Sequence, residues 1–241
     1  MDSISSLISL IRAELKKCPF IQRARWYGSS RFDAASRDVD IAVLVPSKKG
    51  VISPHTYRRL RALRLRLSKE TNLDIDLVPH SIDEWKDLRS PLYYPRYNPA
   101  LSSGLDLKNK FEVKLVAGDK KLFSFSDLNV YVILDNRTIC RRQLVRSMNG
   151  QESRIFVSKL FHAPANILNY WRLKNDKKFE IPISDLGETF RYFDSHFGTS
   201  YYTIYTNASK KKKKMSWEGY IKLMNWYEKL TYEILYTKKF E

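Results

Sequence analysis

The order of secondary-structure signals between residues 23 and 78 constrains the fold of this chain most. A short strand-like run at Arg23–Tyr27 leads into a Gly-Ser-Ser turn, and a second strand-like run follows at Asp38–Val45. Residues 57–69 then carry leucines at helical spacing among many arginines, and residues 73–78 alternate apolar and acidic side chains. Strand, turn, strand, helix and strand in so short a stretch are typical of a mixed α/β unit.

The whole chain is predicted to have an α/β (α+β) fold, in which a small mixed sheet with flanking helices precedes a mostly helical C-terminal region. We expect a sheet-containing domain over residues 1–150 and a helical, basic region over residues 151–241. After residue 104 the patterns predict three strands and then four helices, at Lys110–Ala117, Leu122–Phe125 and Asn129–Leu134, then Thr138–Met148, Ser153–Trp171, Ser184–Phe193 and Ser216–Tyr236.

The charge of the chain indicates a polyanionic partner. Lys and Arg number 43 against 26 Asp and Glu, which gives a formal net charge of +17. Such an excess favours binding to nucleic acid. The first 17 residues read as an amphipathic helix rather than a signal peptide, and no apolar run is long enough to span a bilayer. We therefore expect a soluble, cytoplasmic protein with no membrane partner.

Cysteine and histidine usage argues against a structural zinc site or a disulfide framework. Cys18 and Cys140 lie far apart in the sequence and neither belongs to a CxxC pair. With only 4 histidines, no histidine cluster follows from local spacing. The two cysteines are expected to be buried, reduced thiols.

Two acidic strands carry the candidate chemistry. Asp38 and Asp40 alternate with apolar residues, as do Asp74 and Asp76, so each pair projects from one face of its strand. Adjacent strands would bring the carboxylates to one edge, where their repulsion favours a divalent cation such as magnesium. The alternative is that Asp38 and Asp40 form only the solvent face of an edge strand.

A turn upstream of the first acidic strand suggests a phosphate site. Gly28 allows close approach of the backbone, and free N–H groups at Gly28, Ser29 and Ser30 can bind phosphate oxygens. Arg31 and Arg37 follow in the spacer. Each arginine either reaches phosphate or forms a structural ion pair with the acidic strand.

Three parts follow one another along the chain: the Gly28–Ser29 turn, the strand with Asp38 and Asp40, and the strand with Asp76. In this order they resemble the signature of the DNA polymerase beta-like nucleotidyltransferase superfamily, over roughly residues 20–80. The resemblance implies a nucleotidyltransferase-type sheet in which Asp38 and Asp40 hold two magnesium ions, with manganese as a substitute. It implies that Asp76 binds the ion that lowers the pKa of the attacking hydroxyl, with Asp74 as the competing choice.

By the same resemblance, the turn at Gly28 and Ser29 holds the β and γ phosphates of a nucleoside triphosphate such as ATP, attack occurs at the α phosphorus, and pyrophosphate leaves. Ser30 and Arg31 are placed with them as nucleotide-binding residues. The spacer from Ser30 to Arg37 lacks the second glycine found in some branches, which leaves the subfamily open.

The acceptor is predicted from charge. Arg58 and Arg61 lie in the arginine-rich segment, and Lys211 and Lys212 lie in a run of five lysines, so these four are the predicted nucleic-acid contacts. An RNA end is preferred to DNA, and tyrosines in two clusters are candidates to stack on unpaired bases: Tyr93, Tyr94, Tyr97, Tyr201, Tyr202 and Tyr205.

Two alternatives stay open for the function. One is nucleotidylation of a protein or small molecule, as in toxin–antitoxin or defence-type minimal nucleotidyltransferases. The other is a non-catalytic basic protein that binds nucleic acid. The sequence does not specify the preferred base, the template requirement or the oligomeric state.

Overall fold

The computed structural model describes residues 4–27, 38–87, 89–90, 104–106, 112–113, 125–146, 166, 168, 170–171, 186–210 and 216–238. The elements along the chain are α1 (Ile4–Lys16), β1 (Arg23–Tyr27), β2 (Asp38–Leu44), β3 (Ser47–Lys48), β4 (Val51–Ile52), α2 (Pro54–Thr71), β5 (Asp74–His80), α3 (Ile82–Lys86), β6 (Gly104–Asp106), β7 (Glu112–Val113), α4 (Phe125–Val145), α6 (Leu186–Phe197), α7 (Tyr201–Lys210) and α8 (Trp217–Tyr236).

The central sheet is mixed, as predicted. Its strands lie in the order β5-β2-β1-β6-β7, and β3 and β4 form a separate hairpin. β2 and β5 are parallel, because α2 crosses between them, whereas β1 pairs antiparallel with both β2 and β6. The sheet thus confirms the mixed α/β class and puts the two acidic strands next to each other.

Helix α2 shows how the sequence separates a core face from a basic face. Its buried side chains recur every three or four residues, and its arginines occupy the remaining positions. Ser53 caps the N-terminus by accepting a hydrogen bond from the Thr56 N–H at 3.1 Å, and Asn72 ends the helix in the left-handed conformation at φ 56°. The apolar face packs with α1 in one core cluster: Leu7, Ile11, Leu15, Tyr57, Leu60, Leu63 and Leu67.

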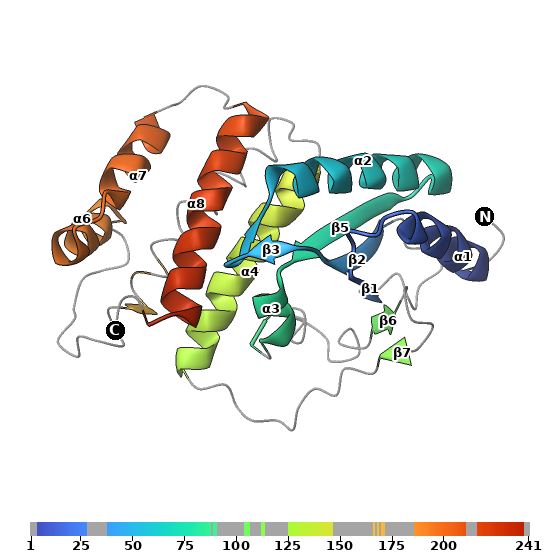
Figure 1. The fold of residues 1–241 in the computed structure, drawn as a ribbon, viewed down its shortest axis with the longest axis horizontal. Helices are drawn as coiled ribbons and strands as arrows, with labels where there is room; N and C mark the ends of the chain where they lie inside the picture. The colour runs from blue at the N-terminus through green and yellow to red at the C-terminus, as the bar shows by residue number, and fades with distance from the viewer. Residues whose placement is uncertain are drawn as a thin grey trace.

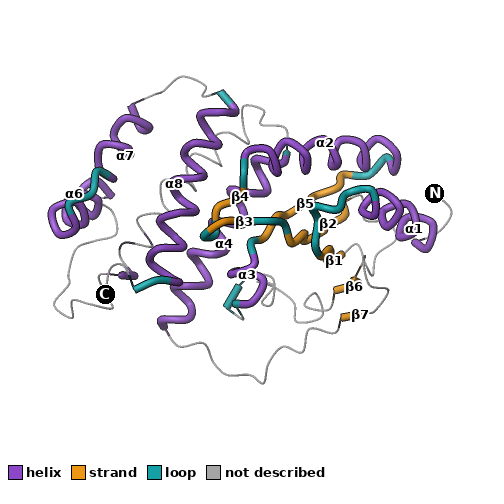
Figure 2. The backbone as a smooth tube through the Cα atoms, viewed as in Figure 1, coloured by secondary structure: helices purple, strands orange, loops and turns teal. Residues whose placement is uncertain are grey.

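Helices α4 and α8 pack side by side next to the sheet, and α6 and α7 form an outer pair (Figure 1). The same arrangement is visible in the tube view, where the strands gather on one side of α4 (Figure 2). Tyr220, Met224 and Tyr227 of α8 belong to the same buried cluster as the residues of α1 and α2. Buried contacts therefore join elements on the two sides of residue 150. The predicted division into domains at this residue stays a prediction.

A buried ionic network joins α3, α4 and α8. Arg137 and Arg141 of α4 are fully buried. Arg137 donates to Glu84 at 2.8 Å, while Arg141 pairs with Glu84 and donates to Glu228 at 2.6 Å. Arg141 also donates to the Gly50 carbonyl at 2.9 Å. Every charge in this network has a partner of opposite sign, as buried charges require.

One predicted strand is wrong. Residues 129–134 form part of the long helix α4, which runs from Phe125 to Val145. The run Val130–Leu134 is apolar and rich in β-branched residues, so the period of its pattern is hard to distinguish over five positions. Burial against neighbouring helices overrides that local preference.

Other differences are smaller. Residues 46–54 contain the β3–β4 hairpin, which was not predicted, and β6, α3 and α7 were not predicted either. The predicted strand Lys110–Ala117 contains β7. Most residues of three predicted elements lie outside the described residues: Lys110–Ala117, Leu122–Phe125 and Ser153–Trp171. The predicted helices at Ser184–Phe193 and Ser216–Tyr236 correspond to α6 and α8. Cys18 and Cys140 are buried and free, as expected.

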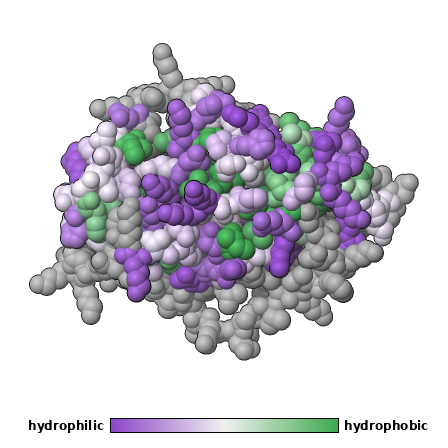
Figure 3. Space-filling view, in the orientation of Figure 1, coloured by the Kyte–Doolittle hydropathy of each residue, from purple (hydrophilic) through white to green (hydrophobic). Residues whose placement is uncertain are grey.

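Among the described residues on the face shown in Figure 3, hydrophilic side chains predominate, with hydrophobic patches between them. Within the described ranges, no helix is both long and apolar enough to cross a bilayer.

Candidate active site

The parallel pairing of β2 and β5 aligns the four predicted carboxylates. Asp38 lies opposite Asp74, and Asp40 lies opposite Asp76, in the register of the two strands. Because side chains alternate along a strand, all four side chains leave the same face of the sheet at the same end of the strand pair. The sequence predicted this meeting of the acidic residues, and the register confirms it.

The depth of the four carboxylates differs. Asp76 is fully buried and the Asp40 side chain is 21% exposed, whereas the Asp74 side chain is 47% exposed and Asp38 is exposed. Asp40 and Asp76 therefore form the inner pair of the cluster. Burial strengthens electrostatic interactions at these two residues.

Three arginines bind the cluster. Arg142 of α4 pairs with Asp76 and donates to Asp40 at 3.2 Å. Arg146, directly after the end of α4, donates to Asp76 and to Asp74 at 2.5 Å each. From α2, Arg64 donates to Asp74 at 2.6 Å and to the Ile75 carbonyl at 2.8 Å. Arginines thus contact the cluster from two helices.

Arg142 and Arg146 were not predicted as site residues. Their spacing of four residues on a predicted helix was a visible signal, because residues i and i+4 lie on one helical face. The sequence did not show which surface that face meets. Only the packing of α4 against β5 brings it to the carboxylates.

The inner carboxylates occupy an unusual electrostatic environment. Burial raises the pKa of Asp40 to about 6, the nearby Arg142 opposes that rise, and the charges of Asp76 and Asp38 add to it. Burial and the charge of Asp40 also raise the pKa of Tyr27, which lies opposite Asp40 on β1. A carboxylate held in this state is a candidate ligand for a cation.

The raised pKa predicts that Asp40 destabilises the protein at neutral pH. The folded state binds a proton at Asp40 more tightly than the unfolded state, so stability falls as pH rises from about 4 through 6. In buffer with a metal chelator, we expect Asp40→Asn to increase the free energy of unfolding by about 1–3 kcal/mol at pH 7.5. Urea unfolding at several pH values measures this. The gain should shrink toward pH 4; a gain independent of pH would contradict the assignment.

The donors of the cluster suit a hard cation. Carboxylate oxygens are the ligands that magnesium takes in proteins, and the mutual repulsion of Asp38, Asp40 and Asp76 favours one. As placed, the side chains of the described residues form no group of three or more metal ligands. Arg142 and Arg146 hold the oxygens instead, so a cation would have to displace at least one guanidinium contact.

Some of the remaining predicted residues lie on described helices, and the others lie outside the described residues. Arg58 and Arg61 lie on α2, on the stretch that leads to Arg64. Tyr201, Tyr202 and Tyr205 lie on α7 and pack against the core, with Tyr205 stacked on Phe190 at 5.0 Å between ring centroids. The others lie outside the described residues: Gly28, Ser29, Ser30, Arg31, Arg37, Tyr93, Tyr94, Tyr97, Lys211 and Lys212.

The protein thus belongs to the mixed α/β class and carries a carboxylate cluster at one end of a parallel pair of strands. Arginines from two sides neutralise this cluster. Comparison with known proteins adds no family: no family model, no curated protein and no solved structure matches this chain.

Proposed function

We propose that this protein is a magnesium-dependent nucleotidyltransferase that transfers a nucleoside monophosphate from a nucleoside triphosphate to a hydroxyl acceptor, with release of pyrophosphate. The observation that supports the proposal best is the register of β2 and β5, which pairs Asp40 with Asp76 and Asp38 with Asp74. Phosphoryl transfer by two metal ions needs two cations held close together, and carboxylates clustered on adjacent strands are suited to hold them.

In this proposal Asp38, Asp40 and Asp76 hold the metal ions. Magnesium would supply the lowered pKa of the acceptor hydroxyl and the positive charge that offsets the developing charge on the phosphate oxygens. We assign Asp76 rather than Asp74 as the third ligand because Asp76 is buried beside Asp40, whereas Asp74 is about half exposed and pairs with Arg64.

Arg142 and Arg146 have a second role in this proposal. In the structure they neutralise Asp40, Asp74 and Asp76, so they keep like charges together. Once a cation takes over that task, their guanidinium groups are free to bind phosphate oxygens, for which a planar fork of donors is well suited. The turn at Gly28 and Ser29 is proposed to bind the rest of the triphosphate.

The acceptor is proposed to be the 3′ end of a nucleic acid, RNA in preference to DNA. A net charge of +17 favours a polyanion and disfavours a polycationic small molecule such as an aminoglycoside. Arg58, Arg61 and the lysine run at residues 210–214 are the proposed backbone contacts. Such contacts give affinity that falls with salt.

One observation favours a second candidate. Because Arg142 and Arg146 already satisfy the inner carboxylates, the cluster can persist without a cation, as it would in a non-catalytic relative that only binds nucleic acid. The two candidates differ in one measurable property, since only the enzyme needs magnesium at Asp40.

The test uses the purified protein, magnesium, and each α-labelled nucleoside triphosphate in turn, with RNA, single-stranded DNA and extract proteins as acceptors. We expect label on RNA and release of pyrophosphate. Label only on protein or on a small molecule would overturn the acceptor and favour a toxin–antitoxin or defence-type enzyme. No label, together with no heat of magnesium binding in calorimetry, would favour the non-catalytic candidate.

A further inference from the structure

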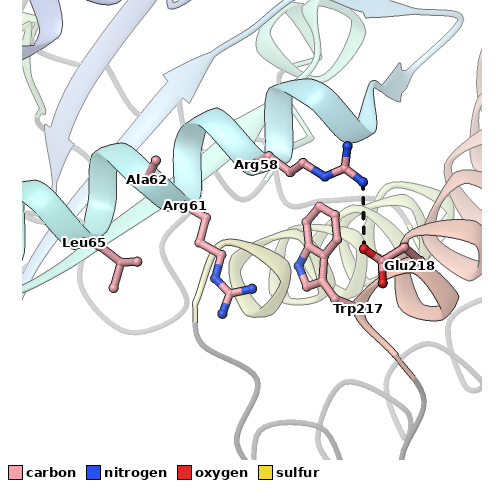
Figure 4. A pocket seen from close by; sticks show the side chains of 6 residues that line it. All are labelled: Arg58, Arg61, Ala62, Leu65, Trp217 and Glu218. Carbon is pink, nitrogen blue, oxygen red and sulfur yellow. Dashed lines mark ion pairs between the residues drawn. The ribbon is translucent and has the colours of Figure 1, made fainter.

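A pocket between α2 and the start of α8 combines aromatic, apolar and cationic side chains. It encloses about 360 Å³ and is lined by Arg58, Arg61, Ala62, Leu65, Trp217 and Glu218. Figure 4 shows Arg58 and Arg61 extending from α2 to either side of the Trp217 ring. This volume lies within the range of roughly 300–1,000 Å³ that is usual for small-ligand sites.

Three features of the pocket match a nucleotide. Trp217 is held in place because its Nε1–H donates to the Leu144 carbonyl at 3.3 Å. Arg58 lies 5.3 Å from the centroid of the indole ring. Leu65 is 49% exposed, which is unusual for a large apolar side chain, and it adds apolar surface to the lining further along α2 (Figure 4). Bases stack on such surfaces through their π faces.

The charges of the pocket suit phosphate. Arg61 lines the pocket and pairs with none of the described carboxylates. Glu218 is the one acid among the described lining residues, and it lies 3.8 Å from Arg58 with both side chains more than half exposed. A pair of this kind is worth little and is exchanged readily. The sequence adds five lysines at residues 210–214, just before Trp217.

The pocket adjoins the carboxylate cluster along two helices. On α2, Arg64 binds Asp74 and lies next to Leu65 and three residues from Arg61. On α4, the carbonyl that holds Trp217 belongs to Leu144, between Arg142 and Arg146. Each link spans about one helical turn, or about 5 Å. The pocket and the carboxylate cluster thus share α2 and the C-terminal end of α4.

We propose that this pocket binds an unpaired nucleotide of the acceptor strand, with the base against Trp217 and the phosphate at Arg61 and Arg58. The inference rests on the proposed function for its acceptor, but its test does not require catalysis. Free nucleoside triphosphate shares the same chemistry, so the experiment separates the two sources.

The experiment measures binding of a short, fluorescently labelled single-stranded RNA by anisotropy, without triphosphate, so that no transfer takes place. We expect Trp217→Ala and Arg61→Ala each to weaken binding about tenfold, and Trp217→Phe to keep most of the affinity. Arg59→Ala is the matched control, because Arg59 lies on the same helix but contacts Phe20, at 3.9 Å from the ring centroid. It removes the same charge and should change binding about twofold or less.

Binding of ATP by the same variants completes the test. Unchanged ATP affinity with weakened RNA binding supports the strand site, whether or not the protein transfers nucleotides. Loss of ATP affinity with normal RNA binding would assign the pocket to free nucleotide and overturn the proposal. Equal RNA binding by the wild type, Trp217→Ala and Arg61→Ala would overturn it as well. Trp217→Phe, which keeps an aromatic ring at the start of α8, guards against an effect of misfolding in Trp217→Ala.

Discussion

Asp40→Asn and Asp76→Asn are expected to lower nucleotide transfer by at least about a thousandfold. Each substitution removes a carboxylate charge from the inner pair while keeping the shape of the side chain. In the proposed mechanism that charge holds the cation, which contributes several kcal/mol of transition-state stabilisation. Each increase of about 1.4 kcal/mol in the activation free energy lowers the rate about tenfold. The measurement is the initial rate of labelled product formation at saturating magnesium.

Asp74→Asn is the matched control for Asp76→Asn. Both residues lie on β5, both accept a hydrogen bond from Arg146 at 2.5 Å, and both leave the same sheet face. They differ in depth, because Asp76 is buried beside Asp40 and the Asp74 side chain is 47% exposed. We expect Asp74→Asn to retain activity within about tenfold. The reverse ranking would move the third ligand to Asp74, and full activity of Asp40→Asn would refute the carboxylate mechanism.

The activity and stability effects of Asp40→Asn are expected to oppose each other. The same substitution that stops transfer should stabilise the metal-free protein at neutral pH, because it removes a buried carboxylate with a raised pKa. Functional sites commonly carry such a cost in stability. A destabilised, inactive variant would instead indicate that Asp40 serves the fold.

Glu84→Gln is expected to produce the largest loss of stability, about 3 kcal/mol at pH 7. Glu84 is fully buried on α3, and it accepts hydrogen bonds from Arg137 at 2.8 Å and from the Ser81 N–H at 3.2 Å. Burial alone would raise its pKa, but Arg137 and Arg141 lower it to about 2. The carboxylate therefore favours the folded state, and its replacement leaves two buried guanidinium groups short of one negative charge.

The pH dependence of this effect has a defined sign. A carboxyl whose pKa is lower in the folded state contributes stability above its unfolded pKa of about 4.5, and loses it as pH falls toward 2. Urea unfolding followed by tryptophan fluorescence should thus show a difference between wild type and Glu84→Gln that narrows below pH 4.5. A difference below about 1 kcal/mol at pH 7 would contradict the network as described.

Two further glutamates serve as controls. Glu218→Gln removes an exposed partner of Arg58 at 3.8 Å and should change the free energy of unfolding by less than about 0.5 kcal/mol. Glu228 is buried and binds Arg141, but its burial raises its pKa in spite of that arginine. We therefore expect Glu228→Gln to destabilise the protein less than Glu84→Gln does.

Local sequence patterns were sufficient for β1, β2 and β5, which include the acidic pair of strands, but they did not predict β6. Alternation of apolar and acidic residues predicted the strands at Asp38–Val45 and Leu73–Val78, and the spacing of leucines predicted the helix between them. A helix between two strands favours a parallel pair, so Asp40 and Asp76 could be expected at one edge. These features depend on residues close in the chain, for which periodicity is informative.

The rest required the tertiary structure. The run at residues 129–134 was ambiguous because its five apolar residues fit both the helical and the strand period. Its burial against other helices makes it part of α4. The contact of Arg142 with Asp76 and of Trp217 with Leu144 joins residues 66 and 73 positions apart. No local pattern encodes such a distance.

The sequence by itself thus determined strands β1, β2 and β5 and the basic character of this protein, because these follow from neighbouring residues and composition. Only the tertiary structure decided which carboxylates lie deepest, which arginines neutralise them, and that Trp217 binds the Leu144 carbonyl near the end of α4. Those properties arise from the packing of α2, α4 and α8 against one another and against β5, and packing depends on the whole chain at once.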